Sequence, residues 1–408
     1  RSEHGERIVF IFVLRVLDCL PMANAMPEFI DIGGEELGEF CVPRSLCAGY
    51  SHPIGLEKGG YGLVVQLESK VPSLPDRAVK MFFTPFKDVK KAQRCYRELQ
   101  LLSGLRHEHI VKMRSAYVTE TTAPELYTVY LTMDYAGVNL FCLIRQESEE
   151  LHVITLRMYK KMLSQLLRAL KYLHSANVIH RDLKPDNIAI DNNWKLTLID
   201  FGLARAIDND NIATRNAGMS FYRALEATAF SDADETLDYN EKVDMWSLGA
   251  ILCEMIIGTP IFEHSFPLGK AIEICGTVPE RILKMIETRT RNPTHVDKLV
   301  IKDLRRRSRQ SERKDFLDLL SGSTARSWLR GDVTSNGDLI VDFINRTLNF
   351  DPDNRMSVKE ALAHPFLAEV REESREVDSG RLRMTDDAPS TIEECRDRIL
   401  QLVREHRE

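Results

Sequence analysis

The stretch Val178–Gly202, which reads VIHRDLKPDNIAIDNNWKLTLIDFG, decides the fold. Two short apolar runs, Ile188–Ile190 and Lys195–Ile199, lie on either side of the polar turn Asp191–Asn193. This arrangement of strand-forming and turn-forming residues predicts a β-hairpin. The hairpin joins two loops that carry acidic residues, so we expect those acids to lie close together.

The two loops carry groups that suit phosphoryl transfer. Asp182, Lys184 and Asn187 belong to the first loop, and Asp200 belongs to the second. The reaction needs a group that orients a hydroxyl, a cation near the moving phosphoryl group and oxygen ligands for Mg²⁺. Because these residue types occur within one short stretch, the sequence predicts a phosphoryl-transfer site.

The composition is that of a globular protein with more than one domain. A chain of 408 residues exceeds the size that one core usually serves, so we expect two lobes or domains. Hydrophobic content of 43% and charged content of 28% are typical of globular proteins. The net charge of −6 gives no reason to expect nucleic-acid binding. The 8 cysteines occur singly, without a CxxC pair, which favours reduced thiols in a cytoplasmic and nuclear protein.

The N-terminal segment is strongly apolar over Ile8–Leu20. It is too short to span a membrane and is interrupted by Arg15 and Asp18, so we expect no membrane association. A signal-peptide core is the alternative, but the cytosolic character of the rest argues against it. We therefore expect Met22 or Met26 to be the native start. Residues 1–25 are then a non-native or disordered extension, and residues 26–50 are a lead-in.

The segment that follows has the features of a small β-rich lobe. Leu56–Gln66 reads LEKGGYGLVVQ, a glycine-rich hairpin signal. Glycines let a backbone approach phosphate closely, although a plain β-turn explains this segment equally well when it is taken alone. The strand expected over Arg77–Phe82 has Lys80 at its centre. An isolated lysine there is usually solvated, but its position after the glycine loop favours a functional role.

A helix and two further strands complete this lobe. Apolar residues at helical spacing predict a helix over Phe86–Gly104 that ends at its glycine. Glu98 lies in this helix, where a surface ion pair is the simplest role. Val111–Tyr117 and Thr128–Met133 are then the closing strands.

The remainder of the chain is predominantly helical. Asp134–Gly137 marks a linker, and Leu156–Ser175 has the apolar spacing of an amphipathic helix. Lys242–Ile257 is nearly all apolar, as expected of a buried central helix. Burial of Asp244 within it is costly without hydrogen bonds, so we expect this side chain to hold the catalytic loop's backbone. Ser357–Glu360 is a capping box that begins the last helix of this region.

Two segments are less specific. Lys298–Asp332 includes the basic run Arg305–Arg309, for which a solvated loop or helix face is favoured over a nuclear-import or regulatory site. Ile392–Glu405 is predicted to be a weakly amphipathic helix that packs back on the protein.

From residue 51 to residue 367 the chain resembles a eukaryotic protein kinase, and the finer resemblance is to the stress-activated branch of the mitogen-activated protein kinases. The resemblance implies an α+β, bilobal fold. Its small, mainly antiparallel β lobe with one key helix covers residues 51–133. Its larger, mainly α-helical lobe, which includes the hinge and a family insert, covers residues 134–367, and a C-terminal extension covers 368–408. The matching motifs are Tyr96–Leu99, Asp200–Arg205, Phe221–Arg223, Ile274–Thr277 and Ala361–Phe366, besides the catalytic loop.

The resemblance also assigns roles to residues at matching positions, with ATP and Mg²⁺ as cofactors. The catalytic residues are Asp182, Lys184, Lys80 and Glu98, of which the last two form an ion pair. The metal ligands are Asn187 and Asp200. The nucleotide-binding residues are Leu56, Gly59, Gly62, Val64, Ala78, Lys80, Met133, Asp134, Ala136 and Asn139. Glu226 and Arg355 are expected to form a buried pair.

Four positions outside the phosphorylation motif and its expected receptor depart from the family pattern. Glu57 replaces a loop glycine, and its carboxylate facing phosphates should weaken ATP binding without abolishing it. Asn139 replaces an acid that accepts a hydrogen bond from the ribose, a modest change. Leu225 replaces a proline and reduces rigidity. Met219 replaces a threonine that hydrogen-bonds the catalytic aspartate and lysine, which a thioether cannot do.

The activation segment retains one of the two residues that the family phosphorylates. Thr214 occupies the threonine of the dual phosphorylation motif, but Asn216 replaces the tyrosine, and Ser220 replaces an arginine that would meet it. We therefore expect a single phosphorylation site at Thr214, with loss of regulation as the alternative. The phosphate-binding arginines of the family are all present, namely Arg94, Arg97, Arg181 and Arg205.

These features lead to two hypotheses of different classes. The first is an active serine/threonine kinase of a stress-type cascade that uses MgATP; the second is a weakly active or inactive scaffold with a kinase surface. The resemblance implies a monomer with protein substrates, an upstream dual-specificity mitogen-activated protein kinase kinase, and docking-motif proteins and phosphatases as partners. The corresponding acidic docking patch comprises Glu369, Glu372, Glu373 and Glu376. Arg371 and Arg375 interrupt this patch, so we expect weak docking.

Overall fold

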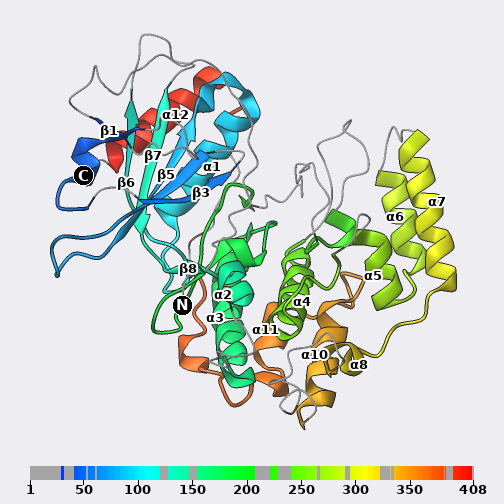
Figure 1. Ribbon diagram of the computed structural model, residues 1–408. Helices are drawn as coiled ribbons and strands as arrows, with labels where there is room; N and C mark the ends of the chain where they lie inside the picture. Colours follow the sequence, from blue (N-terminus) through cyan, green and yellow to red (C-terminus); the bar gives the residue numbers. More distant parts are fainter. Residues whose placement is uncertain are drawn as a thin grey trace, which may run out of the picture. The chain divides into compact units, whose positions relative to one another are not determined.

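The computed structural model describes residues 29–31, 41–51, 54–59, 62–119, 127–146, 154–206, 221–227, 240–263, 267–289, 295–321, 331, 335–380, 382 and 389–406 (Figure 1). The chain forms two compact units. The first comprises Arg1–Lys91, Met113–Tyr135 and Val403–Glu408, and the second comprises Ala92–Lys112 and Ala136–Leu402.

Within the described residues, the first unit is built on a five-stranded sheet in the order β3-β4-β5-β7-β6, in which every neighbouring pair is antiparallel. The side chains of β4 alternate between partly exposed and buried positions, as a strand with one face on a core requires. The strands are β3 (Ile54–Gly59), β4 (Gly62–Leu67), β5 (Arg77–Phe83), β6 (Met113–Thr119) and β7 (Thr128–Asp134).

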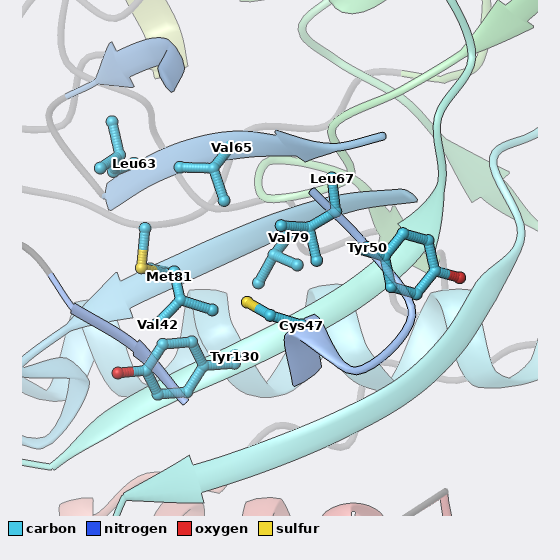
Figure 2. Close-up of a cluster of buried hydrophobic side chains, with 9 residues drawn as sticks. All are labelled: Val42, Cys47, Tyr50, Leu63, Val65, Leu67, Val79, Met81 and Tyr130. Carbon is cyan, nitrogen blue, oxygen red and sulfur yellow. The ribbon is translucent and has the colours of Figure 1, made fainter. Parts of the chain in front are cut away.

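The lead-in segment covers one face of this sheet, a role that its sequence did not predict. Figure 2 shows Val42, Cys47 and Tyr50 packed against side chains from three strands. The sheet side of this cluster consists of Leu63, Val65, Leu67, Val79, Met81 and Tyr130. The lead-in itself contains the short strands β1 (Phe29–Asp31) and β2 (Cys41–Pro43), which pair with each other, and the 3₁₀ turn Arg44–Cys47. Val42, Cys47 and Tyr50 are therefore part of the core.

The second unit is mainly helical, and together the two units confirm the predicted α+β class. Its core helix α4 is buried along nearly its whole length and ends at Gly258, which adopts the left-handed conformation. The described helices are α1 (Val89–Gly104), α2 (Leu140–Gln146), α3 (Leu156–Ser175), α4 (Lys242–Ile257), α5 (Pro267–Cys275), α6 (Glu280–Arg289), α7 (His295–Gln310), α8 (Phe316–Ser321), α10 (Gly337–Thr347), α11 (Val358–Leu362) and α12 (Ile392–Glu405). None of the described helices is both long and apolar enough to cross a membrane.

Several helix boundaries follow from local capping chemistry. Thr155 accepts a hydrogen bond from the backbone of Met158 and begins α3. The predicted capping box of Ser357 and Glu360 is confirmed at the start of α11. The predicted helix over Phe86–Gly104 starts three residues too early, because Pro85–Lys87 forms a 3₁₀ turn and Asp88 caps α1 through its carboxylate.

The segment that follows α1 belongs to the second unit and is hydrogen-bonded within it. His109 Nδ1 donates to the backbone oxygen of Leu196 (2.8 Å), and the amide of Val111 donates to the backbone oxygen of Leu198 (3.0 Å). Helix α12 packs on α1, as predicted, since Arg398 donates to the hydroxyl of Tyr96 (3.3 Å).

Candidate active site

The predicted hairpin is confirmed, and it carries the two acidic loops. β10 (Ile188–Ile190) and β11 (Leu196–Leu198) pair antiparallel, with Ala189 opposite Thr197. Asp191 stabilises the turn by accepting hydrogen bonds from the amides of Asn193 (2.8 Å) and Lys195 (2.9 Å). A third strand, β8 (Val138–Asn139), pairs with β10 and was not predicted.

Asp182 lies at the centre of the first loop. Asn187 Nδ2 donates to the backbone oxygen of Asp182 (2.8 Å) and to its Oδ2 atom (3.0 Å). Lys184 Nζ is 3.6 Å from Oδ2, and Arg223 Nη2 is 3.9 Å from Oδ1. Two cations and an amide therefore surround this carboxylate and fix its position, as a group that orients a substrate hydroxyl requires.

The backbone of the catalytic loop is fixed by Asp244, as its burial predicted. Asp244 accepts hydrogen bonds from the amides of His180 (3.0 Å) and Arg181 (2.9 Å). Arg181 has a φ of +70°, a left-handed conformation that a non-glycine residue keeps only when its surroundings enforce it. The carboxylate of Asp244 thus stabilises a strained loop next to Asp182.

The sequence did not reveal a second partner of this carboxylate. His174, at the end of α3, donates through Nε2 to Asp244 Oδ2 (3.0 Å). Burial alone would raise the pKa of Asp244, but the hydrogen bond and charge of His174, with the amide of Arg181, hold it below its usual value. His180 is fully buried with its ring edge-on to Phe201, and burial lowers its pKa, so its ring is neutral. The position of His174 in the last turn of α3 was the only feature of the sequence that could have indicated its contact with Asp244.

The second loop brings Asp200 near Glu98. Asp200 Oδ1 accepts from the amide of Gly202 (3.0 Å). A Cβ atom added at Gly202 would lie 3.2 Å from Asp200 Oδ1 and 3.2 Å from Glu98 Oε2, so a larger residue there would crowd both carboxylates.

The donor set fits Mg²⁺, which prefers oxygen ligands. Asp200 supplies a carboxylate. Since the amide nitrogen of Asn187 is committed to Asp182, its amide oxygen is the atom that can bind a cation.

Most of the residues expected to hold the nucleotide lie on neighbouring strands of the first unit, whereas Ala136 and Asn139 belong to the second. Val64 is opposite Lys80, Ala78 is opposite Met133, and Gly59 pairs with Gly62 at the β3–β4 turn, while Leu56 lies in β3. Lys80 is buried at the centre of β5. Lys80 and Glu98 belong to different compact units, so their ion pair stays a prediction.

Residues at the linker have additional roles. Arg114 pairs with Asp134 through two hydrogen bonds, which holds β6 to β7. Asn139 accepts from the amide of Cys142 (2.7 Å), so its side chain caps α2. Gly137, next to Ala136, has a φ of +103°, and a Cβ atom there would lie 2.0 Å from the backbone oxygen of Ile190.

The activation segment is described only in part. Thr214, Met219 and Ser220 lie outside the described residues, so the hypotheses about them are untested. The four arginines expected to bind a phosphate lie on α1, in the catalytic loop and in β12 (Arg205–Ala206), whose Arg205 pairs with Ile179 in β9 (Val178–Ile179). These residues are Arg94, Arg97, Arg181 and Arg205.

The segment after Ser220 is anchored to α4 by contacts that the sequence did not predict. Tyr222 donates to Glu254 Oε2 (2.6 Å), and Ser247 donates to the backbone oxygen of Tyr222 (2.7 Å). Burial raises the pKa of Glu254 to about 7, against the lowering effects of the Tyr222 hydrogen bond and the charge of Arg145. Tyr222 contacts Glu254, and the next residue, Arg223, contacts Asp182. Glu254 is therefore connected to Asp182 through two neighbouring residues of the chain.

Glu254 is expected to make stability depend on pH. Because its folded-state pKa is raised, the native protein holds this proton more tightly than the unfolded chain, and stability falls as pH rises towards and through about 7. We expect the wild type to lose about 2 kcal/mol relative to Glu254→Gln between about pH 5 and 8. Urea unfolding of both proteins across this range measures the difference. Parallel stability curves would show that Glu254 titrates normally.

The residues of the expected acidic docking patch are paired within the chain. Glu369 accepts a hydrogen bond from Lys160 (2.8 Å), and Glu372 accepts one from Arg168 (3.4 Å). Lys160 and Arg168 are both residues of α3. Glu376 accepts from Arg371 (2.7 Å). The field that a basic peptide would encounter is therefore weakened by the cations of α3 as well as by the interleaved arginines.

Comparison with known proteins gives concordant matches. The protein kinase domain family model matches residues 51–367. The chain is 32% identical over 351 residues to mitogen-activated protein kinase pmk-1 of Caenorhabditis elegans, covering 84% of this chain and 82% of the relative. It is 29% identical over 347 residues to mitogen-activated protein kinase 12 of Rattus norvegicus, covering 84% of each. It is 32% identical over 319 residues to mitogen-activated protein kinase HOG1 of Beauveria bassiana, covering 78% of this chain and 77% of the relative.

Proposed function

The chain belongs to the protein kinase domain family and is a mitogen-activated protein kinase that phosphorylates serine and threonine residues; we propose that it acts in a stress-type cascade and is switched on at Thr214. The observation that carries the catalytic part is the set of contacts around Asp182. Its carboxylate is held by Asn187, Lys184 and Arg223, on a backbone fixed by Asp244.

Each of these residues has a defined role in the transfer. Asp182 orients the substrate hydroxyl and accepts its proton, and Lys184 stabilises negative charge on the phosphoryl group. Asn187 and Asp200 would hold Mg²⁺, which neutralises charge on the ATP phosphates when it is bound. Lys80, held by Glu98, would bind those phosphates from the glycine-rich lobe.

Replacing Asp182 with asparagine tests catalysis. An amide cannot accept the proton, so we expect phosphate incorporation from radiolabelled ATP to fall at least about 100-fold, both before and after upstream activation. Asp353→Asn is the matched control, because its carboxylate is largely exposed and contacts only Arg281 among the described residues. Equal labelling by the wild type and Asp182→Asn would exclude catalysis and favour a scaffold.

Thr214 is proposed as a single-site switch because its expected receptor is complete. The four arginines that the family uses around this phosphate are all present in the sequence, and a phosphate of about −1.5 to −2 charge would form charge-assisted hydrogen bonds with them and order the loop. We expect treatment with an upstream dual-specificity kinase to place phosphate on Thr214 and to raise activity, whereas Thr214→Ala stays at the basal level. Phosphate mapping that finds an activated form without phosphate at Thr214 would refute this proposal.

The partners follow from the same family. We propose that the protein is a monomer of the cytoplasm and nucleus. Its proposed partners are an upstream kinase, substrates that carry basic docking peptides, other docking-motif proteins, and phosphatases. The internal pairing of Glu369, Glu372 and Glu376 supports weak docking at the acidic patch.

A further inference from the structure

Helix α7 carries a line of cations that the catalytic function does not use. Lys298, Lys302, Arg305 and Arg309 follow one another at intervals of four, three and four residues. At 3.6 residues per turn these positions lie within a strip about 60° wide and about 16 Å long. We call these four residues the α7 basic strip. The basic run near Arg305 is therefore a helix face, as the sequence favoured.

The strip differs from the other cations of the same helix in its pairing. Arg306 and Arg307 both bind Asp303, one turn away on α7. Lys298, Lys302 and Arg309 are exposed and have no ion pair with any residue that the structure describes. Like charges four residues apart on a helix repel each other, so this arrangement is mildly unfavourable without an anion.

Arg305 links the strip to the neighbouring helix α6. It binds Glu287 through both guanidinium nitrogens (2.6 and 3.0 Å) and Glu280 through one (2.9 Å). The two helices run beside one another in Figure 1. Because Arg305 is paired with these two acids, it holds α6 and α7 together, and Lys298, Lys302 and Arg309 are the cations of the strip left for a ligand.

A cavity lies beside the two lysines. Its volume is about 300 Å³, and it is lined by Glu287, Lys298, Ile301, Lys302 and Arg305. Ile301 supplies an apolar wall between lysines that precede and follow it in the chain. The cavity is large enough for one or two side chains and combines an apolar surface with cationic edges.

We propose that the α7 basic strip and this cavity bind an acidic segment of a protein partner, in which carboxylates meet Lys298 and Lys302 and a neighbouring apolar side chain enters the cavity. An extended segment of about five residues matches the length of the strip. This surface is separate from the catalytic residues, so its failure would leave the proposed kinase activity intact.

The residues around the α7 basic strip disfavour two other anionic ligands, a nucleic acid and a membrane surface. Glu280, Glu287 and Asp303 border the strip, and the chain's net charge is −6, so a nucleic acid would meet repulsion beyond the contact itself. Among the α6 and α7 residues whose side chains the structure describes, no large hydrophobic one is exposed, which favours a charged peptide over a membrane as the ligand. A peptide with a few acids and one apolar side chain fits both features.

Binding of a defined acidic peptide to the full chain tests the proposal. The probe is a fluorescein-labelled decapeptide of glutamates with leucine at every third position, titrated by fluorescence anisotropy at two salt concentrations. We expect saturable binding that weakens with salt, and a loss of affinity of at least about tenfold in Lys298→Glu/Lys302→Glu. Lys112→Glu/Lys359→Glu, a matched reversal of two exposed lysines elsewhere, should bind like the wild type.

Several outcomes would overturn the proposal. Absence of saturable binding, or equal affinity in the two double variants, removes the strip as the site. Tighter binding of phosphatidylserine vesicles or of a double-stranded DNA oligonucleotide, lost in Lys298→Glu/Lys302→Glu, would assign the surface to lipid or nucleic acid instead. Self-association seen by sedimentation and lost in that variant would assign it to a second copy. Unchanged phosphate transfer and unfolding midpoint in the variant show that the fold is intact.

Discussion

Replacing Arg355 with methionine is expected to lower the free energy of unfolding by about 3 to 5 kcal/mol. Arg355 donates to Glu226 through both terminal nitrogens, at 2.6 and 3.2 Å, and the two side chains are 0% and 1% exposed. The guanidinium also donates to the backbone oxygens of Asn349 and Lys242. Methionine fills the volume but leaves the Glu226 carboxylate buried without a partner, and that charge dominates the cost.

Denaturant unfolding measures this loss, with two controls. Arg346→Met removes an ion pair with Glu360 between side chains that are 43% and 54% exposed, and it should cost about 1 kcal/mol or less. The double variant Arg355→Met/Glu226→Leu removes both charges and should recover part of the loss, because no charge is stranded. A cost below about 1 kcal/mol for Arg355→Met alone would show that the pair is hydrated.

Replacing Asp244 with alanine should impair both stability and catalysis. The change strands the buried amides of His180 and Arg181 and the ring nitrogen of His174, three donors that now meet one carboxylate. The loss of these three hydrogen bonds is expected to lower the free energy of unfolding by about 3 kcal/mol or more. The left-handed backbone of Arg181 also loses the contact that enforces it, so Asp182 is no longer held in position, and we expect kcat to fall at least about 100-fold.

The kinetic readout separates positioning from simple destabilisation. At a temperature where the variant is still folded, the loss should appear mainly in kcat, because the residues expected to bind the nucleotide lie on other elements. Asp342→Ala is the matched control, since its exposed carboxylate pairs only with His364 among the described residues and should leave kcat unchanged. Retention of wild-type kcat in Asp244→Ala would refute the positioning role.

The parts of the fold that the sequence predicted are those governed by local chemistry. The hairpin from Ile188 to Leu198 needs only its turn residues and two apolar runs, and α4 needs only an unbroken apolar helix. Asp244 was predicted because an unpaired buried carboxylate is too costly to occur. The pair of Glu226 and Arg355, expected from the family resemblance, is present.

The parts that escaped prediction depend on residues far apart in the chain. Val42, Cys47 and Tyr50 carry no periodic signal, because their core position is defined by the sheet that they cover. Strand β8 has two residues and exists only through its pairing with β10. The pairing of Glu369 with Lys160 crosses about 200 residues of sequence, and neither residue alone indicates the other. Only the α1 cap had a local signal that was missed, namely Asp88 after Pro85.

The approach of Gly137 to Ile190 has a consequence for how this protein can vary. β8 is held to β10 with Val138 opposite Ile190 and Asn139 opposite Ala189, and Asn139 then caps α2. Three consecutive residues are thus tied to fixed points on the strand that follows the catalytic loop. The length of this segment is therefore fixed. The exposed side chain of Val138 can be replaced by others, but inserting or deleting a single residue would move Asn139 away from the start of α2 and shift the hairpin.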